Sequence, residues 1–141
     1  MRIKKYVLDA NIWLSYFMTQ REQYLAGIII ENELTLFYSD ELLQEIKRVV
    51  GYKHLEKYKL DGYKISRFIQ IVAVHFELIY PIKNYIPEDQ DDNYIVALAL
   101  QTNSGFITSG DSHILSQKEV LEKKYTKLII ITKAEFEKKF S

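Results

Sequence analysis

The sequence contains no cysteine, which excludes disulfide bonds and thiolate metal sites. It also has no excess of either charge, because 19 Lys and Arg residues balance 19 Asp and Glu residues. A protein that coats nucleic acid usually carries a strong basic excess, so the balance argues against that class. A nuclease stays open, because a metal ion can supply positive charge locally.

Long apolar segments are absent as well. The first residues, Met1 to Lys5, lead straight into a short strand-like run, with no signal-peptide pattern. No apolar run approaches the roughly 18 residues that cross a bilayer. We therefore expect a cytoplasmic protein without a membrane segment. With 141 residues, 48% of them hydrophobic, and no repeat or linker, residues 1–141 are expected to form a single domain with one core.

What the chain does have is an alternation of short apolar runs with segments of helical periodicity. The runs predict strands at residues 3–8, 34–38, 77–80, 105–108 and 128–131. Helices are expected at 12–17, 20–32, 40–50, 62–73, 91–101 and 134–140, with a short one after residue 111. Continuous apolar strands that alternate with helices are typical of an α/β fold, in which helices cover both faces of a parallel sheet.

Two of these predicted helices have candidate caps. Asn11 could cap the helix that starts at Ile12, and Ser39 or Asp40 could cap the next long one.

Acidic residues follow two of the predicted strands. Asp9 comes directly after the first strand, and Asp111 follows the fourth across a Ser-Gly turn. Sites in parallel sheets form outside the carboxyl ends of the strands. If these two strands are neighbours, we expect Asp9 and Asp111 to flank one crevice.

Two further acids lie on the apolar side of helices that begin near the same edge. Glu45 is three residues after Leu42, and Asp92 is three residues before Ile95. An unpaired buried charge is costly, and no His or Arg partner is evident nearby. A divalent cation held by all four carboxylates is the simplest solution. Oxygen ligands without Cys or a His cluster favour Mg²⁺ or Mn²⁺ over Zn²⁺.

Such a site would suit phosphodiester hydrolysis, because a bound cation can orient and ionise a water and stabilise charge on a phosphoryl oxygen. Each acid also has a purely structural alternative. Asp9, Asp92 and Asp111 could cap helices or interact with helix dipoles, and Glu45 could be a surface residue.

The residues around these acids resemble the PIN-domain family. The matching segments are residues 7–11, 39–46, 89–99 and 107–111, in the order and spacing of the family. The resemblance implies a three-layer α/β/α fold with a five-stranded parallel sheet in the order 3-2-1-4-5. It also implies a ribonuclease that depends on Mg²⁺ or Mn²⁺ and cuts single-stranded RNA. By position, the acidic quartet that is both catalytic and metal-binding would be Asp9, Glu45, Asp92 and Asp111.

Supporting positions follow from the same resemblance. Asn11 matches a polar position that supports the first acid, and Thr108 and Ser109 match a hydroxyl-bearing position near the fourth. From the residues alone, His113 could contact substrate, because it lies two positions after Asp111. Trp13 could stack on a base, although core packing is the simpler interpretation.

Basic residues near Glu45 could contact RNA. Lys47, Arg48 and Lys53 could line a path for the substrate, and a solvated helix face is the alternative for each of them. Small proteins that consist of little more than a PIN domain are often toxins of toxin–antitoxin pairs. The resemblance therefore implies an RNA substrate, a cognate antitoxin protein that covers the cleft, and a homodimer.

Three other functions can be compared with the residues present in the sequence. A non-catalytic PIN-like domain that binds RNA or a partner remains an alternative. A phosphatase of the haloacid-dehalogenase type would need a second Asp where this chain has Asn11. A phospho-receiver domain would need an Asp after the predicted third strand, where Pro81 stands.

Overall fold

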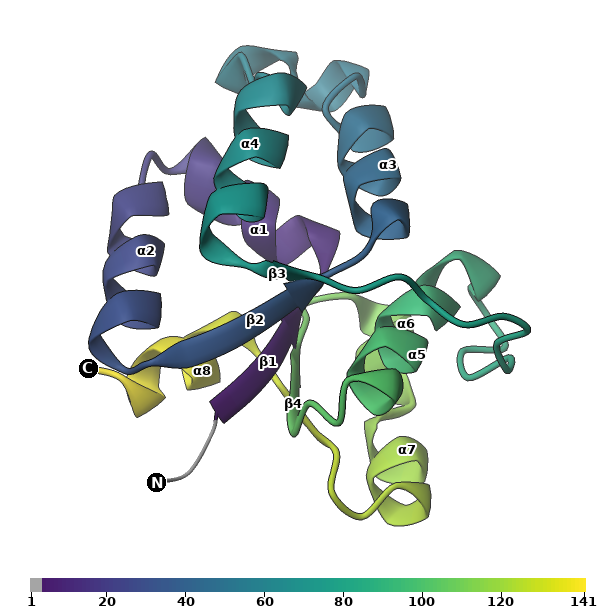
Figure 1. Cartoon of the computed structure of the whole chain (residues 1–141). Coiled ribbons are helices and arrows are strands. Elements are labelled where there is room, and N and C mark those ends of the chain that lie inside the picture. The colour runs from purple at the N-terminus through teal and green to yellow at the C-terminus, as the bar shows by residue number, and fades with distance from the viewer. Residues whose placement is uncertain (1–3) are drawn as a thin grey trace.

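The computed structural model describes residues 4–141 and contains a five-stranded sheet in the order β3-β2-β1-β4-β5, in which every pair of neighbours is parallel (Figure 1). The strands are β1 (Lys4–Leu8), β2 (Leu34–Tyr38), β3 (Val74–His75), β4 (Phe106–Thr108) and β5 (Ile129–Ile131). The predicted α/β class and strand order are confirmed. Residue 3, expected in the first strand, lies outside the described residues.

Helices cover both faces of the sheet and give the molecule three layers (Figure 1). They are α1 (Ala10–Met18), α2 (Glu22–Glu31), α3 (Asp40–Val49), α4 (Gly62–Val72), α5 (Asn93–Gln101), α6 (Ser112–Ser116), α7 (Lys118–Lys124) and α8 (Lys133–Lys139). Two 3₁₀ turns, η1 (Lys53–Tyr58) and η2 (Gln90–Asp92), connect them. Within residues 4–141 no helix is long and apolar enough to span a membrane.

The central strand β1 is the most deeply buried element of the sheet. Tyr6, Val7 and Leu8 have no exposed surface, because helices pack on both faces of this strand. β1 pairs with β2 on one side and with β4 on the other, where Leu8 lies opposite Thr108. The backbone N–H of Asp9 continues this ladder by donating to the Thr108 carbonyl at 3.1 Å. The ends of β1 and β4 are thereby fixed side by side.

The predicted third strand at residues 77–80 is wrong. The strand is Val74–His75, which pairs with Phe37 and Tyr38 of β2. At Ile79 the backbone bonds to a side chain instead of to a strand. Its N–H donates to Gln101 Oε1 at 2.8 Å, and its carbonyl accepts from Gln101 Nε2 at 2.9 Å. The run at residues 77–80 therefore does not form a strand, because the side-chain amide of Gln101 bonds the Ile79 backbone groups that a neighbouring strand would otherwise pair.

Two expectations about helices are also corrected. Asn11 does not cap α1: it is an exposed residue inside the helix, and the cap is Asp9, whose Oδ1 accepts from the Ile12 N–H at 3.0 Å. Ser39 occupies the cap position of α3 without a side-chain hydrogen bond. Helix α7 was not predicted at all, because only Leu121 of its seven residues is buried and no apolar stripe marks it.

Candidate metal centre

Asp9 lies at the end of the central strand with only 5% of its surface exposed. While Oδ1 caps α1, Oδ2 accepts a hydrogen bond from the Ser109 hydroxyl. Burial raises the pKa of Asp9 to about 6, although these two hydrogen bonds act in the opposite direction. The charges of Glu45 and Asp111 raise it further, so both of these predicted acids lie near Asp9.

Asp111 lies across the β1–β4 junction and begins α6. Its Oδ1 accepts from the backbone N–H groups of His113 at 2.8 Å and Ile114 at 3.2 Å. Its own N–H donates to the Ser109 hydroxyl at 3.0 Å. Ser109 therefore holds Asp9 through its proton and Asp111 through its lone pair. The neighbouring Thr108 hydroxyl is buried and has no hydrogen-bond partner among the described residues.

Asp92 ends η2 and is 8% exposed. Its Oδ2 is buried without a hydrogen-bond partner in the described part of the chain. Burial, followed by the charges of Asp111 and Asp89, raises the pKa of Asp92 to about 8. One carboxylate oxygen of Asp92 lies within 4.8 Å of one carboxylate oxygen of Asp111. A cation between the two groups would favour the ionised form of both.

Glu45 approaches the same region from α3. Its Oε1 accepts a hydrogen bond from the hydroxyl of Tyr94, which lies on α5. Burial raises the pKa of Glu45, while the bond from Tyr94 and the nearby Arg48 lower it. The charge of Glu45 also raises the pKa of Asp92. The structure thus brings the four acids named from the sequence into one electrostatic cluster.

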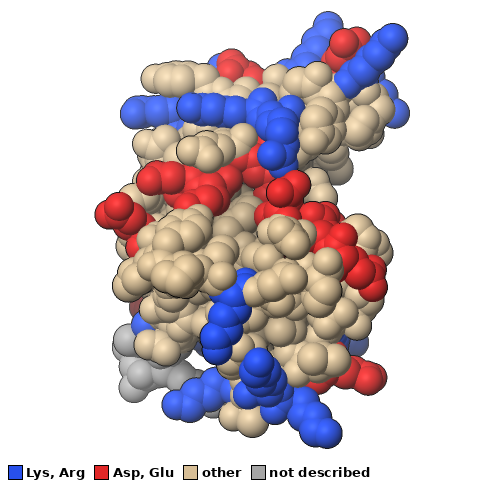
Figure 2. Space-filling model, turned by 90° about the vertical axis from the view of Figure 1, so that its right-hand side faces the viewer, with Lys and Arg blue, Asp and Glu red and all other residues tan. Residues whose placement is uncertain are grey.

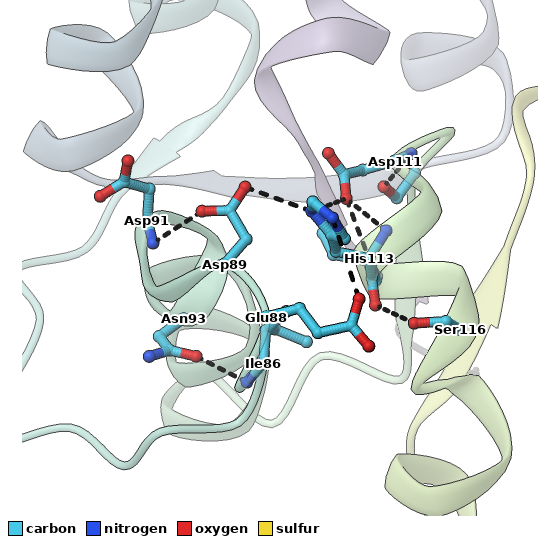
Figure 3. Close-up of polar contacts among 10 residues, drawn as sticks. Ile86, Glu88, Asp89, Asp91, Asn93, Asp111, His113 and Ser116 are labelled. Carbon is cyan, nitrogen blue, oxygen red and sulfur yellow. Dashed lines mark hydrogen bonds and ion pairs between the residues drawn. The ribbon is translucent and has the colours of Figure 1, made fainter.

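Two residues that sequence reasoning did not place at a metal join this cluster. One ligand atom from each of Asp89, Asp92, Asp111 and His113 lies within 4.8 Å of all the others. Figure 3 shows the His113 ring between Asp89 and Asp111. Asp89 accepts from the Asp91 N–H at 3.1 Å, which fixes the acidic loop before α5. The available signals were the run of acids before Asn93 and the spacing of His113 from Asp111.

A family model described as the PIN domain matches residues 5–113, which is more than half of the chain. The chain belongs to the PIN-domain family. No curated protein matches it.

Among solved structures, this PIN domain is similar to a chain in the crystal structure of VapBC2 from Rickettsia felis bound to a DNA fragment from their promoter. The TM-score is 0.57, the sequence identity is 16%, and the match covers 91% of this chain and 98% of that chain. At this identity the likeness shows a shared fold.

The acidic residues of the PIN domain fit a divalent cation. The buried, unpartnered Oδ2 of Asp92 lies among carboxylates whose mutual repulsion raises their pKa values. Carboxylate oxygens are the preferred ligands of Mg²⁺ and Mn²⁺. The principal holders would be Asp92 and Asp111, with Asp9 and Glu45 beside them.

Basic side chains lie beside the acids rather than among them. Figure 2 shows a band of acidic side chains across one face, with Lys and Arg above and below it. Arg48 is exposed on α3, and its pKa is raised mainly by Tyr52 and to a smaller extent by the charges of Glu45 and Asp91. Lys53 is exposed at the start of η1, and Lys47 lines a small cavity with Ser66 of α4. Trp13 is fully buried and packs edge-on against Phe68.

A separate cavity of about 980 Å³ lies at the opposite edge of the sheet, where β1, β4 and β5 begin. Its lining includes five lysines and no Asp or Glu: Lys4, Lys5, Lys124, Lys127 and Lys139. The acidic centre is therefore not the larger cavity. It differs from that cavity in its negative charge and in Oδ2 of Asp92, which has no hydrogen-bond partner among the described residues.

Proposed function

We propose that this PIN domain is a divalent-metal-dependent endoribonuclease that cleaves single-stranded RNA with Mg²⁺ or Mn²⁺. The observation that carries the proposal is the buried Oδ2 of Asp92, which has no partner and lies beside Asp111. The proposal keeps the quartet expected from the sequence, Asp9, Glu45, Asp92 and Asp111, all of which lie within the segment that the PIN-domain model matches.

The side chains of the centre would have different roles in this reaction. Asp92 and Asp111 hold the cation, and Ser109 links the carboxylate of Asp9 to the backbone N–H of Asp111. When bound, the cation supplies an ionised water and stabilises charge on a phosphoryl oxygen. Tyr94 binds one oxygen of Glu45, which leaves the other to contact the cation or to take a proton from water.

RNA is the proposed substrate because the centre has basic side chains at its border. Phosphates approach an acidic cluster only where cations offset the repulsion. Arg48 is exposed near that border, close to Glu45 and Asp91, and Lys47 and Lys53 are exposed on α3 and η1. In this proposal the three side chains contact the RNA backbone.

We further propose that the protein is a cytoplasmic toxin of a toxin–antitoxin pair. The fold shared with a chain of the VapBC2 structure supports this. A cognate antitoxin would cover the acidic cleft with basic side chains, and the toxin would act as a homodimer.

Cleavage of labelled single-stranded RNA tests the nuclease function. Wild type should cut with Mg²⁺ or Mn²⁺ and not with EDTA. Asp9→Asn keeps a side chain able to cap α1 but removes its charge, and we expect cleavage to fall by at least about 100-fold. Asp61→Asn is the matched control, because Asp61 caps α4 through Tyr63 and Lys64 in the same way.

The control should cut RNA like wild type. RNA that binds to wild type but stays intact with every divalent ion would favour the alternative, a non-catalytic PIN-like domain that binds RNA or a partner. Hydrolysis of a phosphomonoester instead of RNA would point to a phosphatase.

A further inference from the structure

The imidazole of His113 faces the acidic centre. Its Nδ1 lies 3.4 Å from Oδ2 of Asp89 and 3.8 Å from Oδ1 of Asp111. This nitrogen is buried and has no hydrogen-bond partner among the described residues. A buried ring nitrogen without a partner is unfavourable, so its surroundings favour a ligand at this position.

The other ring nitrogen faces a different carboxylate. Nε2 of His113 lies 3.9 Å from Oε2 of Glu88 (Figure 3). Metal-binding histidines commonly direct their second N–H to a carboxylate, which fixes the tautomer that presents a lone pair to the metal. At 3.9 Å Glu88 is beyond hydrogen-bond range, so its flexible side chain would have to move closer to accept from Nε2 and leave the lone pair on Nδ1.

The neighbouring carboxylates complete a set of four donors. Atoms of Asp89, Asp92, Asp111 and His113 lie within 4.8 Å of one another. Two ligands on one octahedral ion lie about 3 to 4 Å apart, so small side-chain movements suffice. Within this set, Oδ2 of Asp92 and Nδ1 of His113 are both buried without a hydrogen-bond partner among the described residues.

We infer that His113 is a metal ligand in this centre and that it makes the PIN domain selective for Mn²⁺ over Mg²⁺. Mg²⁺ prefers oxygen ligands and retains its waters, whereas Mn²⁺, a transition-metal ion, accepts an imidazole nitrogen more readily than Mg²⁺ does. The inference rests on the proposed function only for the presence of a cation in the cleft. It adds Asp89 and His113 to the quartet named from the sequence.

The alternative is that His113 is a protonated base that neutralises Glu88, Asp89 and Asp111. The two roles predict effects of opposite sign. A ligand contributes to metal affinity, so its removal weakens binding. A fixed positive charge competes with the metal, so its removal strengthens the binding of every divalent ion.

Direct binding without RNA separates these cases. The loss of the free Mn²⁺ signal in electron paramagnetic resonance gives the Mn²⁺ affinity, and displacement by Mg²⁺ gives the preference. For wild type we expect Mn²⁺ to bind at least about tenfold more tightly than Mg²⁺. In His113→Ala the Mn²⁺ affinity should fall by about 10- to 100-fold and the Mg²⁺ affinity by much less. His113→Gln, which retains a polar side chain, should show the same direction.

His75→Gln is the matched control. His75 contacts Asp40 at 3.0 Å, outside the set of four donors, and its replacement should leave both affinities unchanged. Circular dichroism confirms that each variant is folded.

An unchanged preference for Mn²⁺ in both His113 variants would overturn the inference, as would tighter binding of both ions. Wild type that binds neither ion would also overturn it. If RNA is cut but the preference does not change, the inference fails and the nuclease function stands. If the preference changes as expected but RNA stays intact, His113 is a ligand and the nuclease proposal fails.

Discussion

At the scale of single residues, Ser109 decides how two of the acids are arranged. Its hydroxyl donates to Oδ2 of Asp9 and accepts from the N–H of Asp111, and the residue is fully buried. The donated bond favours the ionised form of Asp9 and so opposes the effect of burial on its pKa. The relative position of Asp9 and Asp111 and the ionisation of Asp9 therefore both depend on the Ser109 hydroxyl.

Replacing Ser109 with Ala should reduce stability and activity together. We expect a loss of about 1–3 kcal/mol in the free energy of unfolding, because Asp9 loses a buried hydrogen bond. RNA cleavage should also fall. Ser104→Ala is the control: Ser104 is buried with its hydroxyl 2.7 Å from that of Thr102, away from the acids. Urea unfolding and cleavage rates measure both effects. Equal activity losses in the two variants would contradict a positioning role.

The raised pKa values of Asp9 and Asp92 predict how stability depends on pH. Both acids bind protons more tightly in the folded state, with pKa values of about 6 and about 8, than in the unfolded chain. The metal-free protein should therefore lose stability as pH rises from about 4 to 8. Asp9 alone should account for a loss on the order of 3 kcal/mol.

Urea unfolding in EDTA at several pH values checks this expectation. In Asp9→Asn the part of the loss between about pH 4 and 6 should be smaller. Saturating Mn²⁺ should remove most of the dependence, because a cation favours the ionised carboxylates. Stability that rises through this pH range without metal would contradict the assigned burial of the two acids.

The residues of the centre were only partly predictable from the sequence. Asp9 and Asp111 could be located because each directly follows a strand, and strand ends meet at one edge of a parallel sheet. Asp89 and His113 were not assigned to a metal, because their approach depends on the path of residues 83–89. That path has no periodicity, and tertiary contacts such as the bond from the Ile86 N–H to Asn93 at 2.7 Å fix it.

At the scale of elements, the sequence predicts those whose side chains form the core. Helix α5 is buried along nearly its whole length, and the apolar run of its sequence indicates this clearly. Strand β3 has only two residues, both exposed, so its own residues give no apolar signal. Helix α7 is mostly charged, and apart from the buried Leu121 it contacts the sheet through hydrogen bonds of its charged side chains. Glu122 accepts from the Ile130 N–H at 2.8 Å, and Lys118 donates to the Ile130 carbonyl at 2.7 Å.

Glu122 is therefore expected to stabilise the edge strand β5. Although burial raises the pKa of Glu122, its bonds with Ile130 and Lys118 lower it overall, so the ionised form is favoured in the folded protein. Glu122→Ala leaves the Ile130 N–H without a partner and should reduce the free energy of unfolding by about 1–3 kcal/mol. Glu119→Ala, at an exposed position of the same helix, should change it by less than about 0.5 kcal/mol. Chemical denaturation compares the two; similar values would exclude this role for Glu122.

At the scale of the whole molecule, the last elements are part of the same layered structure as the segment that matches the family. The match ends at residue 113, yet β5 pairs with β4 along the sheet. Phe136 of α8 is fully buried and meets Tyr6 of the central strand edge-on, with ring centroids 5.4 Å apart. These contacts support the expectation of a single domain.

A single domain predicts one cooperative transition that depends on both ends of the chain. Phe136→Ala should lower the free energy of unfolding by about 3–5 kcal/mol and shift the whole transition. Tyr63→Ala, at a side chain that is 71% exposed, should have little effect. Calorimetry that resolves a separate early transition in Phe136→Ala would show that the C-terminal segment unfolds on its own.

Opposite charges lie at the two ends of the strands, and this arrangement affects how the protein interacts with other molecules. Carboxylates gather where β1 and β4 end, and lysines line the cavity where these strands begin. A chain with zero formal net charge therefore carries local clusters of opposite charge at the two ends of its strands. In dilute buffer near neutral pH, we expect the lysine-lined end of one molecule to attract the carboxylates of another. Physiological salt, with a Debye length of about 8 Å, weakens that attraction.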